Sequence, residues 1–150
     1  MKKNQGFSLV ELIVVIAIMA VLVGVLAPAY LRYVEKSRKS SDISSISDII
    51  SAGEKIAVDV QFDLAAANTL VVTIKNGAVS YAVTGNTDAT KEWTDICGAS
   101  YTCKSKEFKE SSADVVITGA IQAAGNVKWT ASGQTIIVTY SPDFKTKWGL

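Results

Sequence analysis

Few residues of this chain have the types and spacing that chemistry requires. Histidine is absent, which removes the usual proton shuttle near neutral pH and the usual imidazole metal ligand. The only cysteines, Cys97 and Cys103, lack the two-residue spacing of a redox-active pair and are too few for a metal site. No serine has a lysine three residues later, and neither a glycine-rich phosphate loop nor calcium-loop spacing is present. We therefore expect a protein that is not an enzyme and holds no metal or cofactor.

The charge composition gives a nucleic-acid-binding role no support. Lysine and arginine total 15 against 14 acidic residues, so the net charge is +1 and no global field would attract an anionic polymer. Lys104, Lys106 and Lys109 surround Phe108 and could contact such a polymer locally. Two glutamates alternate with these lysines, a pattern more typical of a solvated mixed-charge surface.

One carboxylate borders a long apolar segment. Residues 12–27 contain no polar side chain, so a helix formed from them is apolar on all sides and must be buried in lipid or protein. At about 1.5 Å per residue this segment is shorter than a hydrocarbon core of about 30 Å, so flanking residues must enter the bilayer. If Tyr30 and Tyr33 mark an aromatic interface belt, Glu11 lies at the opposite membrane edge. A carboxylate in an apolar helix is costly, which indicates a function for Glu11.

Three interpretations of this segment compete: a cleaved secretory signal, an ordinary membrane anchor, and a short leader followed by an assembly helix. Lys2 and Lys3 form a basic start, and residues 27–29 resemble a small-residue cleavage site. Pro28 fits poorly between the two small residues of such a site. A simple anchor gives no reason for Glu11. A secreted binding protein whose signal peptide ends at Ala29 remains the alternative from another functional class.

A family resemblance supports the leader and assembly helix. Residues 1–33, which read MKKNQ, then G, then FSLVELIVVIAIMAVLVGVLAPAYLRY, resemble the N-terminus of type IV pilins and pseudopilins. In that family a basic leader ends in glycine, the next residue is usually phenylalanine, and a glutamate follows four residues after it. In this chain these residues are Gly6, Phe7 and Glu11. The resemblance implies that a prepilin peptidase cuts after Gly6 and methylates the new amine of Phe7. It also implies that Glu11 pairs with the Phe7 amine of a neighbouring subunit during assembly.

Alternatives accompany these site predictions. Glu11 could instead only stabilise its own helix N-terminus through the helix dipole, by about 0.3 to 1 kcal/mol. Pro28 lacks the backbone donor of its helix position, and Gly24 lies one turn earlier, so we predict a kink or a local opening there. The alternative is a proline that the membrane helix tolerates.

The chain is predicted to comprise a leader at residues 1–6, one long helix at 7–60 and a globular head at 61–150. Residues 7–31 would be the membrane anchor and later the filament core, and residues 32–60 the amphipathic part. A basic cluster at the junction could rest on lipid headgroups; it consists of Arg32, Lys36, Arg38 and Lys39. Beyond it apolar residues recur at helical spacing, with Gly53 on the same stripe; they are Ile43, Ile46, Ile50, Ala57 and Val60.

The head is predicted to be a β-sheet that packs on this helix. Asn76 and Gly77, between strands at 70–75 and 78–83, are a strong hairpin signal. Weaker strands are expected at 115–118, 127–130 and 135–140, the last two joined around Ser132 and Gly133. The predicted fold is α+β, with an antiparallel sheet of about four strands, as in the pilin fold.

The resemblance implies a structural subunit of a type IV pilus, a fimbrium that serves tasks such as adhesion or motility. Its partners would be further copies of itself in a helical homopolymer, the prepilin peptidase, an assembly ATPase and a membrane platform protein. The precursor would cross the cytoplasmic membrane once with its N-terminus inside, and the mature chain would lie in the pilus at the cell surface. In a head outside the cytoplasm, Cys97 and Cys103 would form a disulfide that adds roughly 2 to 2.5 kcal/mol. The nearest alternative is a pseudopilin for secretion or DNA uptake.

Overall fold

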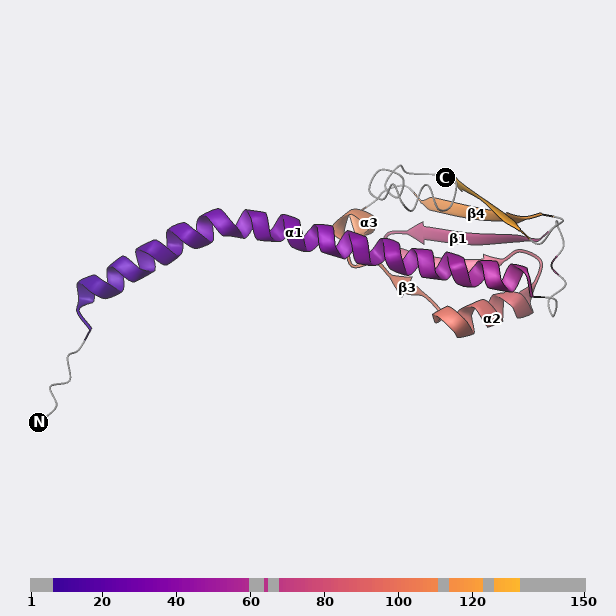
Figure 1. The fold of residues 1–150 in the computed structure, drawn as a ribbon, viewed down its shortest axis with the longest axis horizontal. Helices are drawn as coiled ribbons and strands as arrows, with labels where there is room; N and C mark the ends of the chain where they lie inside the picture. Colours follow the sequence, from indigo (N-terminus) through magenta and orange to yellow (C-terminus); the bar gives the residue numbers. More distant parts are fainter. Residues whose placement is uncertain (1–6, 60–63, 65–67, 111–113, 123–125, 133–150) are drawn as a thin grey trace, which may run out of the picture. The chain divides into compact units, whose positions relative to one another are not determined.

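The computed structural model describes residues 7–59, 64, 68–110, 114–122 and 126–132. It has the α+β fold that the sequence predicts, with a long N-terminal helix and an antiparallel sheet (Figure 1). The elements in chain order are α1 (Leu9–Ala57), β1 (Thr69–Lys75), β2 (Ala78–Val83), α2 (Thr87–Cys97), β3 (Tyr101–Thr102), α3 (Lys106–Glu110), β4 (Val115–Ile121) and β5 (Val127–Ser132). Two compact units, Met1–Ser37 and Arg38–Leu150, divide the chain within α1, and each is described by itself.

In the first unit the described residues form the N-terminal part of α1. The helix runs without interruption through Gly24 and Pro28, and the local opening suggested for this region stays a prediction. A Cβ atom added at Gly24 would meet nothing within 4 Å. The kink at Pro28 stays a prediction.

The second unit contains the sheet, whose strand order is β3-β2-β1-β4-β5 with every neighbouring pair antiparallel. Asn76 and Gly77 close the predicted hairpin between β1 and β2, and both have positive φ angles, 49° and 78°. Such a turn matches the right-handed twist of the two strands it joins. The predicted strands at 70–75, 78–83, 115–118 and 127–130 are confirmed. The strand at 135–140, the turn at Gly133, residue Val60 and the leader lie outside the described residues.

The core of the second unit lies between the sheet and the C-terminal part of α1. Alternate residues of β1 are buried, and the predicted helical stripe of α1 faces them: Ile46 and Ile50 are fully buried. Gly53 lets Trp93 approach, because a Cβ atom at this position would lie 2.5 Å from the indole ring. The close approach expected at Gly53 is therefore confirmed.

Among the described residues the sheet has five strands where about four were expected, because β3 is only two residues long and carries no alternating pattern. Two short helices were also missed. α2 is capped by Asn86, whose side chain accepts a hydrogen bond of 2.8 Å from the Ala89 amide, and it buries little besides Trp93. α3 buries Phe108. A short polar segment with so few buried side chains has no recurring apolar positions at helical spacing, so the sequence does not predict these helices.

Candidate functional site

The N-terminal end of α1 has a defined start. Ser8 precedes the first helical residue, Leu9, and its backbone N–H donates to the Glu11 carboxylate over 2.9 Å. This is one half of a capping box, in which a side chain in the first turn satisfies a backbone donor that the helix itself leaves unpaired. A carboxylate here also interacts favourably with the helix dipole. Within a single chain, Glu11 therefore stabilises its own helix N-terminus.

Phe7 lies immediately before this cap and is 85% exposed. It is not part of the helix, and Gly6 lies outside the described residues. The serine three residues before Glu11 was present in the sequence as a capping-box signal that the sequence analysis did not use.

The apolar surface that follows is exposed along its whole length. Every residue from 7 to 33 is exposed, and the large apolar side chains among them range from 42% exposed at Val15 to 85% at Phe7. By length and composition α1 contains one candidate membrane span, and no residue of its most apolar stretch is buried by the rest of the described chain. Exposed apolar patches of this size mark contact with protein or membrane. This helix surface is therefore the main candidate functional site.

At the start of the second unit, one buried carboxylate binds α1 to a loop of the sheet. Asp42 is fully buried. It accepts hydrogen bonds from the Tyr101 hydroxyl at 2.8 Å, the Lys104 amide at 2.9 Å and the Ser105 amide at 2.8 Å. Because several donors surround it, the carboxylate is satisfied despite its burial. Asp42 is not among the functional residues that the sequence predicts, because its position alone gives no sign of these distant partners.

Two indole groups add contacts farther along the same part of α1. Trp93 of α2 donates to the backbone carbonyl of Ile49 over 2.9 Å, and Trp129 of β5 donates to the Glu54 carboxylate over 2.9 Å. Together with the Asp42 contacts, these bonds connect α1 to three separate segments of the second unit. This part of α1 is thus a structural element of the fold.

The two cysteines are free thiols in the structure, which contradicts the predicted disulfide. Cys97 is half-buried at the end of α2, whereas Cys103 is buried in the core. Burial raises the pKa of Cys103 to about 12, with a further contribution from the charge of Asp42. Burial, followed by the charge of Asp48, also raises the pKa of Cys97. Both thiols are therefore poor nucleophiles near neutral pH.

Comparison with known proteins gives two kinds of match. Residues 1–27 match the family described as the prokaryotic N-terminal methylation motif. Two curated relatives, both named "Fimbrial protein" and both from Pseudomonas aeruginosa, are each 27% identical over 112 residues, which cover 67% of this chain and 72% of theirs. No solved structure matches the chain. These matches and the long helix on an antiparallel sheet confirm the family resemblance: the chain resembles type IV pilins and carries an N-terminal methylation motif.

Proposed function

We propose that this chain is the precursor of a structural subunit of a type IV pilus, polymerised through the N-terminal part of α1. The observation that carries the proposal is the apolar helix surface of residues 12–27, which is exposed along its whole length, beside the Glu11 carboxylate at the helix start. Lipid covers that surface in the precursor, and the same surfaces of other copies cover it in the filament. This arrangement supports a structural role for the chain.

Processing begins, in this proposal, when a prepilin peptidase cuts between Gly6 and Phe7. Phe7 and Ser8 precede the helix, and an exposed non-helical segment is accessible to a peptidase. Cleavage converts the backbone N–H of Phe7 into a charged amine, which the same enzyme methylates. The new cation then lies near the end of an apolar helix that is to be buried.

Glu11 supplies the counter-charge for that amine in a neighbouring subunit. Its carboxylate already accepts the Ser8 N–H, but a carboxylate has about four acceptor positions and can hold a second donor. An unpaired charge buried in an apolar core costs about 3 to 5 kcal/mol, so the ion pair selects the register in which both charges are satisfied.

The precursor crosses the cytoplasmic membrane once with its N-terminus inside, and an assembly ATPase and platform protein extract it into the filament. α1 is long and apolar enough for the span. The fimbrial relatives favour a pilus over the related pseudopilin of a secretion or DNA-uptake system.

Glu11→Ala tests the proposal. We expect the mature N-terminus to remain Phe7 while sheared surface filaments fall at least about 100-fold, since the buried amine loses its partner. Glu35→Ala, which removes the same charge outside the apolar segment, is the control and should leave the yield unchanged. Filaments of Glu11→Ala at wild-type yield would contradict the pairing.

A further inference from the structure

Basic residues concentrate at one end of the second unit. They belong to the start of its α1 segment, to the end of β1 and to the loop and helix α3 that pack there: Arg38, Lys39, Lys75, Lys104, Lys106 and Lys109. We call this set the basic end. Figure 1 shows α3 beside the part of α1 at which the second unit begins. Acidic side chains are present but fewer; they are the buried Asp42 and the more exposed Glu107, Glu110 and Asp114, and Glu110 lies 3.5 Å from Lys106 Nζ.

The basic end is fixed in position by polar contacts. Asp42 binds the amides of Lys104 and Ser105, which lead directly into α3. Lys39 of α1 forms an ion pair with Glu107 of α3. Lys75 Nζ lies 3.0 Å from Asp114, which connects β1 to the residue before β4. Since these contacts hold the backbone that carries the lysines, their charges form a defined surface.

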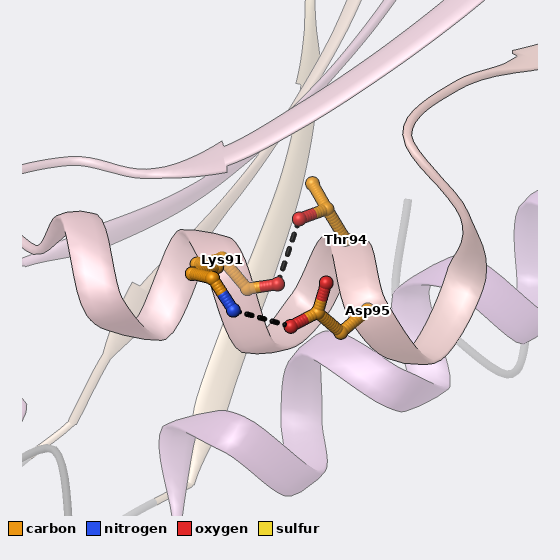
Figure 2. Close-up of polar contacts among 3 residues, drawn as sticks. All are labelled: Lys91, Thr94 and Asp95. Atoms are coloured by element: carbon orange, nitrogen blue, oxygen red, sulfur yellow. Dashed lines mark hydrogen bonds and ion pairs between the residues drawn. The ribbon is translucent and has the colours of Figure 1, made fainter.

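Acidic residues concentrate instead on the exposed face of α2. Asp88, Glu92 and Asp95 follow one another at helical spacing and are exposed. Lys91 is the one basic residue of α2, and Figure 2 shows its ammonium paired with Asp95 at 2.8 Å while the Thr94 hydroxyl donates to the Lys91 carbonyl. The hydrogen bond and charge of Asp95, and then the charges of Glu92 and Asp88, raise the pKa of Lys91. α2 therefore carries net negative charge; we call Asp88, Glu92 and Asp95 the acidic face.

An apolar residue and a hollow adjoin the acidic face. Ile96 of α2 is 56% exposed. It lines a hollow of about 440 Å³ between α2 and α1, together with Asp48, Ala52 and Lys55. An exposed apolar residue rimmed by charged groups is the usual composition of a protein interface.

We propose that the acidic face of one chain binds the basic end of a second copy in the filament. The two surfaces have opposite charge and belong to different parts of the same chain. A contact between two different patches of identical subunits is heterologous, and such contacts generate open helical assemblies. If the apolar helices pack in parallel, the second units of all copies have the same orientation. The acidic face of one copy can then meet the basic end of the next copy. This inference rests on the proposed function and adds a specificity contact between second units.

A protein partner fits the basic end better than lipid or nucleic acid. Glu107 and Glu110 interrupt the lysines, and an anionic polymer or bilayer would be repelled by both. A second chain can place its Lys91 near those glutamates while its acidic residues meet Lys104 and Lys106. Complementary charges of this kind determine partner orientation, and like charges brought together oppose it.

Charge reversal tests the contact in cells that assemble the full-length chain. Lys104→Glu with Lys106→Glu reverses the basic end, Asp88→Lys with Glu92→Lys reverses the acidic face, and a third chain combines all four changes. We expect each reversal to lower sheared filaments about 10-fold or more and the combined chain to recover to within about 2-fold of wild type. Lys128→Glu, which reverses the charge of an exposed residue in β5 outside both surfaces, should have no effect. Thermal unfolding of each chain checks that it is folded.

Cross-linking tests the same contact without substitutions. A zero-length carbodiimide is applied to assembled or membrane-bound wild-type protein made as a mixture of light and ¹⁵N-labelled chains. We expect mixed-isotope links from Lys104 or Lys106 to Asp88 or Glu92.

The outcomes separate this inference from the proposed function. If wild-type chains form no filaments, the proposed function fails. The contact is then tested in the membrane alone: mixed-isotope links there support it, and their absence contradicts it. Normal filaments from both reversals, or no recovery in the combined chain, would overturn the inference. A third result would also overturn it: the basic-end reversal lowers the amount of membrane-bound protein but leaves the ratio of filamentous to membrane-bound protein unchanged. Lipid would then be the partner of the basic end.

Discussion

The two parts of α1 have the same backbone conformation and opposite surroundings. Residues 9–33 are exposed throughout, and Ile16 is 56% exposed, whereas Ile46 and Ile50 in the second unit are 0% exposed. The second part has an apolar stripe that the sheet covers, and the first is apolar on all sides. Folding of one chain therefore buries only the second part. The distribution of apolar residues around a helix therefore also indicates what covers it. A single stripe is covered within the chain, and a helix that is apolar on all sides needs lipid or another chain.

The largest effect is expected where a charge enters the first part of α1. Ile16→Asp should abolish surface filaments, because a carboxylate at the centre of a bilayer costs about 3 kcal/mol and is also excluded from an apolar filament core. Val58→Asp, at a comparably exposed apolar residue of the second unit, is the control for membrane insertion. Both are measured as membrane-bound and filamentous protein; retention of filaments by Ile16→Asp would refute the distinction between the two parts.

Much of the difference between the two parts of α1, and part of the sheet, could be predicted from the sequence. The uniform apolar run, the stripe through Ile46 and Ile50 and the Asn76-Gly77 hairpin are local patterns, and each predicts its element without knowledge of distant residues. Asp42 could not be found in this way. Its carboxylate is satisfied by the hydroxyl of Tyr101 and by two amides about 60 positions along the chain, and such contacts exist only after the fold has formed.

The next largest effect is expected at Asp42. Asp42→Ala leaves the buried Ser105 amide, the part-buried Lys104 amide and a tyrosine hydroxyl without their acceptor, so we expect a loss of roughly 3 kcal/mol in the unfolding free energy of the second unit. Asp48→Ala, at an exposed carboxylate of the same helix, should change it by less than about 0.5 kcal/mol. Denaturant unfolding followed by tryptophan fluorescence, to which the buried Trp93 and Trp129 contribute, measures both. Equal effects would show that Asp42 is no anchor.

Two glycines of α1 give a matched pair for packing. Gly53→Ala places a Cβ atom 2.5 Å from the Trp93 ring, and we expect overpacking to cost about 1 to 3 kcal/mol of unfolding free energy. Gly24→Ala meets nothing within 4 Å and should leave the unfolding of the second unit unchanged. The same fluorescence assay compares them, and a neutral Gly53→Ala would show that α1 and α2 do not approach as described.

The smallest effect concerns the thiols. A Cys103 pKa raised from 9.0 to about 12 stabilises the folded protein fully below pH 9, and this contribution is lost as the pH rises from 9 towards 12. At pH 8.5 a maleimide should label the half-buried Cys97 well before Cys103, as mass spectrometry of digested protein would show. Equal labelling rates, or no reactive thiol before reduction, would contradict the free and unequal thiols of the structure.

What sequence reasoning missed at the N-terminus was a local contact. The Ser8 and Glu11 spacing fits a capping box, yet Glu11 was interpreted only through the dipole and through assembly. The short elements β3 and α3 have a different cause, since two to five residues carry no measurable period. The disulfide was inferred from the presence of two cysteines in a head placed outside the cytoplasm, and neither fact determines how the two side chains are oriented.

Assembly through α1 depends most directly on where the mature chain begins. The measurement is the N-terminal residue and intact mass of the protein sheared from its native cell surface as filaments. We expect a chain that starts at N-methylated Phe7. A chain that retains Met1 would be a plain membrane anchor, and one that starts at Tyr30 would be a secreted protein; either result would contradict assembly through α1.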